Sequence, residues 1–511
     1  MRPDEYAVDF DGADAESVMG KELSVGEIGT DERVAGAWAR SLFESGSETA
    51  DDRVAIGYRA DRDRGAKAVT IGCGESARPT AIFGEGGTGK SALLGNVAVQ
   101  LAHRGRGFCL IDMNGNGAPE LVRRLPEDRL DDLVCIDATG RHNEDRVAGL
   151  NFLRASIDRE DERAFDKEVE AIVDDMRSII RDESYWGSRM NVIFNTICRA
   201  MVRSEKPYTL VDMYYVLLDE EYREYFVEDI DDGVVPRCAR MIADDMDQED
   251  LDPLLRRLKK IVESPDTREV TAHRDARTDL GSCIEDGKIV AIRADAADWD
   301  GRRIIAQMIA KKLSAAARTR GRSDGTGDAP PYHVLGHGID SMDEIGRMFA
   351  REREMGLRPI MTARSPTQLS EKAGVGIFAE CETLLSMRVA GVDELLIPFL
   401  GEMEIDSLHE LDEFEMVVER ATGDGGDRRV VQTFAPYPPV RGMAEAEEAI
   451  DASLDRYGSP RADPDKIFGD TIIGRAEYDM DHESIIEDAV DGGGGDGNGN
   501  DNGTSEDGGN S

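Results

Sequence analysis

Two kinds of hydrophobic pattern alternate along this chain. Short, nearly continuous apolar runs are typical of strands that are buried on both faces of a parallel sheet. Longer segments with apolar residues three or four positions apart are typical of helices. We expect strands at residues 80–83, 108–112, 133–137, 288–293, 332–335, 359–362 and 383–389, and helices at 91–103, 302–318 and 342–355. This alternation predicts an α/β fold with a mainly parallel sheet.

The strand–helix alternation is interrupted in the middle of the chain. Residues 152–280 show only helical periodicity, with apolar positions at Phe165, Val169, Ile172, Val173, Met176 and Ile180. Further helices are expected at 190–203 and 250–263. We therefore expect an all-α domain inserted into the sheet domain.

Shorter signals flank this central pattern. We expect a helix at 33–43, strands at 54–56 and 69–71, a hairpin of 415–419 and 430–434 around 423–426, and a helix at 443–457. The segment 492–511 consists largely of Gly, Asp and Asn and is expected to be disordered.

The strand at 80–83 runs into the phosphate-loop pattern G-x-x-x-x-G-K-[ST]. Its eight positions are Gly84, Glu85, Gly86, Gly87, Thr88, Gly89, Lys90 and Ser91. Glycines let the backbone wrap closely around phosphates, and N–H groups at the start of the following helix attract the anion. We expect Lys90 on the β- and γ-phosphates and the Ser91 hydroxyl on Mg²⁺. A glycine-rich turn without a ligand is the alternative, but the preceding strand and following helix favour a nucleoside triphosphate such as ATP.

These patterns together predict a RecA-like P-loop NTPase core that is split by an all-α insert. The expected parts are an acidic N-terminal segment (1–50), a first part of the ATPase core (51–151), the all-α domain (152–280), a second part of the core (281–440), a C-terminal helical extension (441–490) and a disordered tail (491–511).

The chain is strongly acidic, with a formal net charge of −43 from 105 acidic and 62 basic residues. Among the basic residues 50 are arginine and only 12 are lysine. The charge is spread along the chain and 40% of residues are hydrophobic, which excludes a disordered acidic protein. We interpret this surface as halophilic, because a Debye length of about 3 Å in molar salt screens the self-repulsion. The acidity therefore says little about partners, and no basic patch marks a DNA-binding surface.

Cysteine usage and hydropathy point to the cytoplasm. The seven cysteines are scattered without a C-x-x-C pair, as expected of free thiols in a reducing compartment. The first residues do not form a signal peptide, and no stretch approaches about 18 uncharged apolar residues. We expect a cytoplasmic protein without a membrane span of its own, which a membrane-anchored partner protein would have to recruit.

Six short motifs follow the phosphate loop. They are the segments 110–115 (LIDMNG), 149–153 (GLNFL), 186–189 (WGSR), 286–290 (DGKIV), 351–357 (REREMGL) and 368–369 (QL). In this order and spacing they resemble the HerA/FtsK superfamily of pumping ATPases, most of all the TraG/TraD-type coupling proteins of conjugative type IV secretion. The resemblance covers residues 70–460. It implies a RecA-like motor domain with an all-α insert, a homo-hexameric ring, and ATP hydrolysis coupled to the movement of DNA or, in some members, of protein.

The chain departs from this family at the second motif, where the family has a hydrophobic strand ending in Asp-Glu. Here the strand is followed by Gly336 and His337, so the acids that would hold the Mg²⁺ water shell and orient the attacking water are missing. Asp340, or the pair Asp343 and Glu344, could serve if the strand runs further, or these could be loop acids that cap the next helix. His337 could accept a proton from water.

Other charged residues at strand ends are also candidates. Asp112 and Asp137 end apolar strands at the edge where ligands bind in such sheets, or else cap the next turn, and Asp112 is a candidate for the Mg²⁺ site. Arg364 stands where the family has a phosphate-sensing glutamine. It could clamp a phosphate, act in trans as an arginine finger, or be a surface ion-pair residue. Arg351 and Arg353 are further finger candidates, although arginines at a helix end usually compensate the helix dipole.

The leading hypothesis is a DNA-translocating ring ATPase of mobile-element transfer, a homo-hexamer with DNA in its pore and with ATP and Mg²⁺ as cofactors. The altered second motif favours an alternative, a nucleotide-binding assembly or switch protein with weak or no hydrolysis. A third hypothesis is an ATPase that powers protein export or virion assembly, since no aromatic cluster or basic groove identifies DNA as the cargo.

Overall fold

The computed structural model describes most of the chain between residues 53 and 461. The described residues are 43–44, 53–61, 65–75, 77–115, 117–139, 142–143, 145–157, 159–180, 186–230, 248–294, 299–323, 330–338, 348–349, 356–366, 369, 371–381, 383–389, 406–420 and 427–461.

Eleven strands within these residues form one sheet, in the order β2-β1-β12-β11-β10-β3-β9-β8-β4-β7-β5. The strands from β10 to β5 are parallel: β10 (Thr383–Ser386), β3 (Thr80–Phe83), β9 (Leu357–Ala363), β8 (Tyr332–His337), β4 (Phe108–Asp112), β7 (Ile289–Arg293) and β5 (Leu133–Asp137). The remaining strands pair antiparallel: β1 (Arg53–Asp61), β2 (Gly65–Gly72), β11 (Glu415–Arg420) and β12 (Asp427–Thr433). Because parallel strands point the same way, the loops after β3, β4, β8 and β9 all leave the sheet at one edge.

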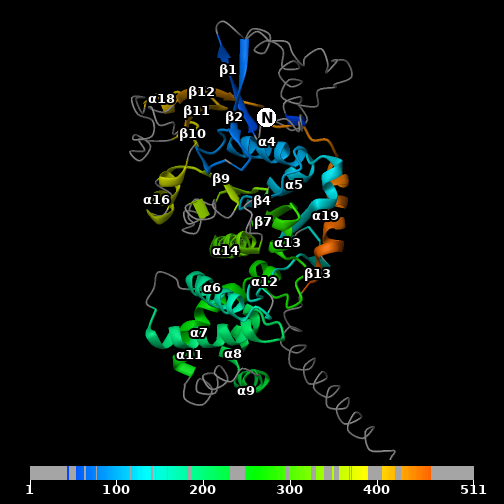
Figure 1. The fold of residues 1–511 in the computed structure, drawn as a ribbon, viewed down its shortest axis with the longest axis vertical. Helices are drawn as coiled ribbons and strands as arrows, with labels where there is room; N and C mark the ends of the chain where they lie inside the picture. The colour runs from blue at the N-terminus through cyan, green and yellow to red at the C-terminus, as the bar shows by residue number, and fades with distance from the viewer. Residues whose placement is uncertain are drawn as a thin grey trace, which may run out of the picture. The chain divides into compact units, whose positions relative to one another are not determined.

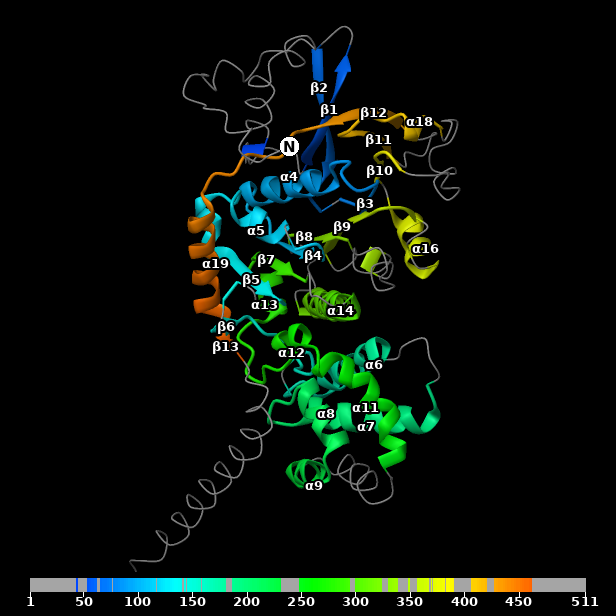
Figure 2. The same ribbon diagram turned by 180° about the vertical axis from the view of Figure 1, so that it is seen from behind.

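Helices cover both faces of the parallel strands, as their apolar composition requires. The strands β3, β4, β5 and β9 are buried along their whole length. In both views α4 (Lys90–His103) lies on one side of β4 and β7, and α14 (Trp299–Ser323) lies on the other (Figures 1 and 2). The helix α19 (Met443–Tyr457) packs on the edge strand β5, where the Cys135 N–H donates to Ser453 Oγ at 2.9 Å. Shorter elements of the core are α5 (Gly117–Val122), the 3₁₀ helix η2 (Glu127–Asp132), α13 (Leu280–Glu285), α16 (Glu371–Glu380) and α18 (Asp406–His409).

A helical block lies between β5 and β7 in the sequence. Its helices are α6 (Glu162–Ile180), α7 (Ser188–Arg203), α8 (Leu210–Leu218), α9 (Glu220–Asp229), α11 (Gln248–Val262) and α12 (Pro265–Thr271). The apolar stripe of α6 is buried, and α8 begins with a capping box formed by Thr209 and Asp212. Lys311 of α14 donates to Asp175 Oδ1 of α6 at 2.9 Å, which ties the block to the sheet core. The chain therefore has the predicted fold class, a RecA-like P-loop NTPase core with a parallel sheet and an inserted all-α domain.

Several bounds and one pairing differ from the sequence-based expectation. The strand β8 runs two residues further than expected, to His337, and β10 ends at Ser386 rather than at 389. The hairpin β1–β2 joins the main sheet through β12, whereas local patterns predicted only two isolated strands. A short strand β6 (Arg146–Val147) also pairs with β13 (Ser459–Pro460). The expected helices at 33–43 and 342–355, the turn at 423–426 and the tail at 492–511 lie largely or wholly outside the described residues. Within the described part of the chain, no helix has the length and apolarity needed to cross a membrane.

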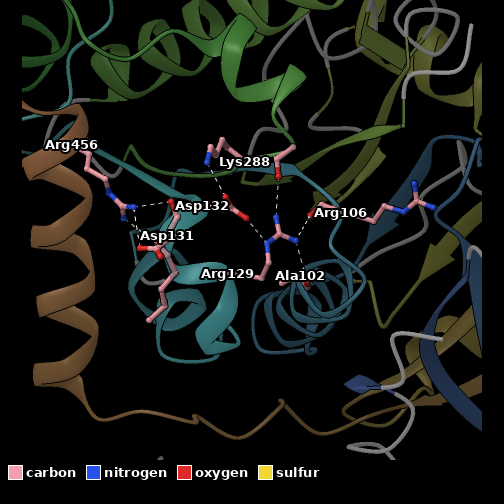
Figure 3. A network of polar contacts seen from close by, with 9 residues as sticks. Ala102, Arg106, Arg129, Asp131, Asp132, Lys288 and Arg456 are labelled. Carbon is pink, nitrogen blue, oxygen red and sulfur yellow. Dashed lines mark hydrogen bonds and ion pairs between the residues drawn. The ribbon is translucent and has the colours of Figure 1, made fainter. Parts of the chain in front are cut away.

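A polar network joins several elements at the other ends of the parallel strands (Figure 3). Buried Arg129 of η2 donates to Asp132 Oδ2 at 2.9 Å, to the Ala102 oxygen of α4 at 3.1 Å, and to the Gly287 oxygen before β7 at 3.0 Å. Lys288 donates to Asp132 Oδ1 at 2.9 Å. One guanidinium thus bridges the end of α4, which begins at the phosphate loop, and the start of β7.

Candidate functional site

The phosphate loop joins the buried strand β3 to the first turn of α4. Gly87 and Gly89 have φ angles of +82° and +104°, which glycine adopts without steric cost. The Gly84 N–H donates to a β9 carbonyl oxygen at 3.2 Å, and the Glu85 N–H donates to a carbonyl oxygen just after β10 at 2.9 Å. Strands on both sides of β3 therefore hold the beginning of the loop.

The side chain of Lys90 folds back into the loop. Its Nζ donates to the carbonyl oxygens of Gly84 and Glu85, the second at 2.6 Å, and the residue is buried. Thr88 Oγ1 donates to the same Glu85 oxygen at 2.9 Å. The ammonium group thus lies beside the N-terminus of α4, where backbone N–H groups and the helix dipole favour an anion.

An aromatic ring packs against the end of the loop. A Cβ added to Gly89 would lie 2.7 Å from Cδ1 of Phe414, so no larger residue fits at this position. Phe414 has a φ of +67°, which is uncommon for a bulky residue, and its carbonyl oxygen accepts from the Thr433 N–H at 2.8 Å. No sequence pattern points to this contact, because it depends on how the β11–β12 hairpin docks beside the loop.

Three side chains from different elements meet beside the first turn of α4. Ser91 Oγ lies 2.8 Å from Nε2 of His337, the last residue of β8. Nδ1 of the same ring lies 3.2 Å from Oδ1 of Asp112, the last residue of β4. The strands β4 and β8 are paired with Asp112 opposite His337, and this register brings the two side chains together. A hydroxyl, an imidazole and a carboxylate therefore form one line of contacts.

Asp112 is fully buried and is held in its ionised form. Burial raises the pKa of its carboxyl, but hydrogen bonds from His337 and from the Asn114 and Gly117 N–H groups outweigh this effect, so that the pKa is lowered. Oδ1 accepts from the Asn114 N–H at 3.0 Å, and Oδ2 accepts from the Gly117 N–H at 2.6 Å. Asp112 thus both caps the start of α5 and faces the ring of His337.

The ionised carboxylate determines which nitrogen of His337 carries the proton. A carboxylate oxygen can only accept, so Nδ1 is the donor to Asp112, and in the tautomer that this contact selects Nε2 faces Ser91 with its lone pair. Nδ2 of the exposed residue Asn114 lies 3.2 Å from both ring nitrogens, so it contacts the ring between them rather than along the Nε2 lone pair.

A cavity of about 1010 Å³ opens over these groups. Residues of the phosphate loop and of the facing strand ends line it, among them Gly86, Gly87, Gly89, Lys90, Ser91, Asn114, His337 and Arg364. Arg364 is exposed and follows β9, so its guanidinium is available to a ligand in the cavity. The volume lies at the upper end of the range of roughly 300–1,000 Å³ that is usual for ligand sites.

Among the remaining candidates from the sequence, Asp137 is the described one, and it does not join this cluster. Asp137 closes the turn after β5, where its carboxylate accepts from Thr139 N and Oγ1 at 2.9 and 2.6 Å and from His142 N at 3.0 Å. Asp340, Asp343, Glu344, Arg351 and Arg353 lie outside the described residues. Sequence reasoning missed Asn114 and Phe414, although Asn114 stands two residues after a strand end.

Comparison with known proteins identifies the fold. No family model and no curated protein sequence matches the chain. Among solved structures, it is similar to the plasmid coupling protein TrwB in complex with ADP and Mg²⁺, at 14% identity and a TM-score of 0.53 over 79% of this chain and 94% of that one. It is also similar to the bacterial conjugative coupling protein TrwB in complex with sulphate, at 13% identity and a TM-score of 0.52 over 78% and 94% of the two chains. The chain thus shares a TrwB-like, RecA-type P-loop NTPase fold.

Proposed function

We propose that this protein binds ATP together with a divalent cation in the phosphate loop and hydrolyses it to drive the movement of DNA through a homo-hexameric ring. The observation that carries the proposal is the loop itself. Lys90 lies inside it, Ser91 stands at the first turn of α4, and both line the cavity of about 1010 Å³.

The residues of this site have distinct roles in the proposal. Backbone N–H groups of residues 86–89 hold the β-phosphate, and Lys90 neutralises the charge that develops on the γ-phosphate. Ser91 Oγ is an oxygen ligand for the cation. His337 occupies the place of the missing acid at the end of β8, with its Nε2 facing Ser91 Oγ at 2.8 Å.

The likeness to TrwB supports the DNA and ring parts of the proposal. TrwB is named as a conjugative coupling protein, and a structure of it contains ADP and Mg²⁺. A shared fold by itself does not determine cargo. DNA, the ring and a membrane-anchored partner therefore rest on analogy, whereas nucleotide binding rests on the loop.

A second candidate function is a nucleotide-dependent switch that binds ATP tightly and turns it over slowly. The imidazole at the end of β8 favours it, because His337 replaces the carboxylate that would orient water, and the nearby carboxylate of Asp112 is engaged by backbone N–H groups.

Steady-state ATP hydrolysis separates the two functions. We would measure it in about 2–3 M KCl, where charge repulsion is screened, with and without double- and single-stranded DNA. The Lys90→Ala variant is compared with Lys259→Ala, which removes an exposed lysine from α11. DNA-stimulated turnover that Lys90→Ala abolishes and Lys259→Ala preserves supports the motor. ATP binding without turnover supports the switch, and absence of ATP binding in the unmodified protein refutes both.

A further inference from the structure

The contact between Ser91 and His337 places an oxygen and a nitrogen donor side by side, and these two atoms bear on which cation the site prefers. In the proposed function Ser91 Oγ is a ligand of the cation, and an oxygen ligand suits Mg²⁺. The next donor in the structure is a nitrogen, His337 Nε2, at 2.8 Å from Ser91 Oγ. Imidazole nitrogen is a preferred ligand of transition metals rather than of Mg²⁺, which favours oxygen and water. The donor set therefore fits Mg²⁺ only in part.

The distance between the two donors matches a pair of ligands on one metal ion. Two ligands at roughly 2.1 Å from an octahedral ion, in neighbouring positions, lie about 3.0 Å from each other. The observed 2.8 Å between Ser91 Oγ and His337 Nε2 is close to this value. The ion would lie to one side of the line that joins the two atoms, so their separation need hardly change.

The second nitrogen of the ring is held as in known metal sites. Histidines that bind a metal usually donate their other N–H to a carboxylate, which fixes the tautomer and raises the basicity of the ligand nitrogen. Asp112 Oδ1 plays this part at 3.2 Å from His337 Nδ1. Because Asp112 also accepts from backbone N–H groups on both oxygens, it cannot turn toward the cavity as a ligand itself. It is a positioning residue for the ring.

We propose that Ser91 Oγ and His337 Nε2 are neighbouring ligands of the cation that accompanies the nucleotide, and that the site prefers a transition metal such as Co²⁺ over Mg²⁺. This inference rests on the proposed nucleotide binding. Among the described residues, no group of three or more His, Cys, Asp or Glu side chains could hold a metal. Phosphate oxygens of the nucleotide must complete the coordination sphere, so the metal and the nucleotide bind together.

The first test is the affinity for ATP with each metal, measured on the full-length protein by calorimetry. Metal is kept in excess so that all ATP is present as its Mg²⁺ or Co²⁺ complex. We expect Co²⁺–ATP to bind more tightly than Mg²⁺–ATP, because imidazole nitrogen is a better ligand for a transition metal than for Mg²⁺. His337→Ala removes the preference, and His337→Asp reverses it because a carboxylate favours Mg²⁺. Asp112→Asn weakens Co²⁺–ATP binding about tenfold while keeping a carbonyl oxygen for the α5 cap.

A matched control and a direct signal separate ligation from simple packing. Lys259→Ala, which removes an exposed lysine from α11 far from the ring, should leave the metal preference unchanged. Pulsed electron paramagnetic resonance of the Mn²⁺–ADP complex should show coupling to an imidazole nitrogen, and His337→Ala should abolish it.

The outcomes distinguish this inference from the proposed function. If the unmodified protein binds ATP with neither metal, the proposed function is refuted and the inference with it. If ATP binds equally well with both metals, or if Mn²⁺–ADP shows no nitrogen coupling, only the inference is overturned and nucleotide binding stands.

Discussion

Arg129 offers the sharpest test of how the phosphate-loop helix is fixed in place. This buried guanidinium connects the C-terminal end of α4 to the start of β7, at the edge of the sheet away from the loop (Figure 3). In the same view Arg456 of α19 makes similar contacts on the protein surface. It donates to the Asp131 carbonyl oxygen at 2.8 Å and to Asp131 Oδ1 at 3.2 Å. We compare Arg129→Ala with Arg456→Ala.

The expected cost follows from the partners that each change leaves behind. Arg129 makes hydrogen bonds to the carbonyl oxygens of Ala102 and Gly287 at 3.1 and 3.0 Å and a longer one to that of Arg106 at 3.5 Å. It also forms an ion pair with Asp132, whose side chain is 31% exposed. At about 1 kcal/mol for each of the two shorter hydrogen bonds and at most about 1 kcal/mol for the partly exposed ion pair, Arg129→Ala should cost about 3 kcal/mol. The Asp131 side chain is 99% exposed, so the pair with Arg456 contributes little to stability. Arg129→Lys keeps the charge but loses the planar fork and should fall between the two.

Urea unfolding followed by circular dichroism in about 2–3 M KCl measures these differences, because salt at this level screens surface charge. The Arg129→Ala midpoint should fall well below that of the unmodified protein, while Arg456→Ala stays near it. Affinity for ATP without urea should be the same for both variants, since the network touches α4 at its far end. Equal midpoints for the two alanine variants would refute the reasoning, because the buried arginine would then contribute no more to stability than the exposed one.

Three further predictions concern other parts of the chain. Gly89→Ala should abolish ATP binding, measured by calorimetry, because the new Cβ meets Phe414 at 2.7 Å and φ is +104°. The comparison is Gly95→Ala inside α4, where the new Cβ meets no atom of another element within 4 Å. This variant should raise the free energy of unfolding by about 0.5–1 kcal/mol, measured by urea midpoints. Burial, aided by nearby arginines, lowers the pKa of His333 to about 3, so the unfolded chain takes up a proton below about pH 6.5 that the folded chain refuses. Stability should therefore fall by about 1.4 kcal/mol per pH unit between pH 6 and 3 from this residue alone, and His333→Leu should show a correspondingly flatter pH profile of urea midpoints. Lys311→Met removes the shorter of two ion pairs from α14 to Asp175 of α6, the other being made by Arg318. Limited proteolysis should then cut the helical block before the sheet core. Simultaneous cleavage of both parts would disprove this role of Lys311.

The elements of the parallel core could be predicted because their signal is local. A strand buried on both faces is a continuous apolar run, and β4 and β5 begin and end where that run does. The helix α19 also has the bounds that its periodicity predicts. Pairing partners carry no such signal. The hairpin β1–β2 joins the sheet through β12, which follows it by more than three hundred residues, and no local pattern encodes that contact.

The same distinction applies to the candidate site. The phosphate loop is one continuous segment, so its pattern names all of its residues. The contact of Ser91 with His337 joins residues 246 positions apart in the sequence, and it exists because β8 extends two residues beyond its apolar run. His337 could be named as a candidate from its place after a strand, but its partners could not.

Asp112 and Asp137 show what decides between equivalent sequence patterns. Each ends a five-residue apolar strand, and both are opposite Arg293, the last residue of β7 that lies between them. The order β8-β4-β7-β5 places Asp112 beside His337, whereas Asp137 ends the outermost strand and closes its own turn. The pattern of each strand specifies a carboxylate at the functional edge, and only the order of the strands determines which carboxylate contacts His337. The topology of the sheet therefore determines that Asp112 is the carboxylate that orients the proposed metal ligand His337. For Asp137 to take that role, the order of the strands would have to change, because both positions already carry the same residue.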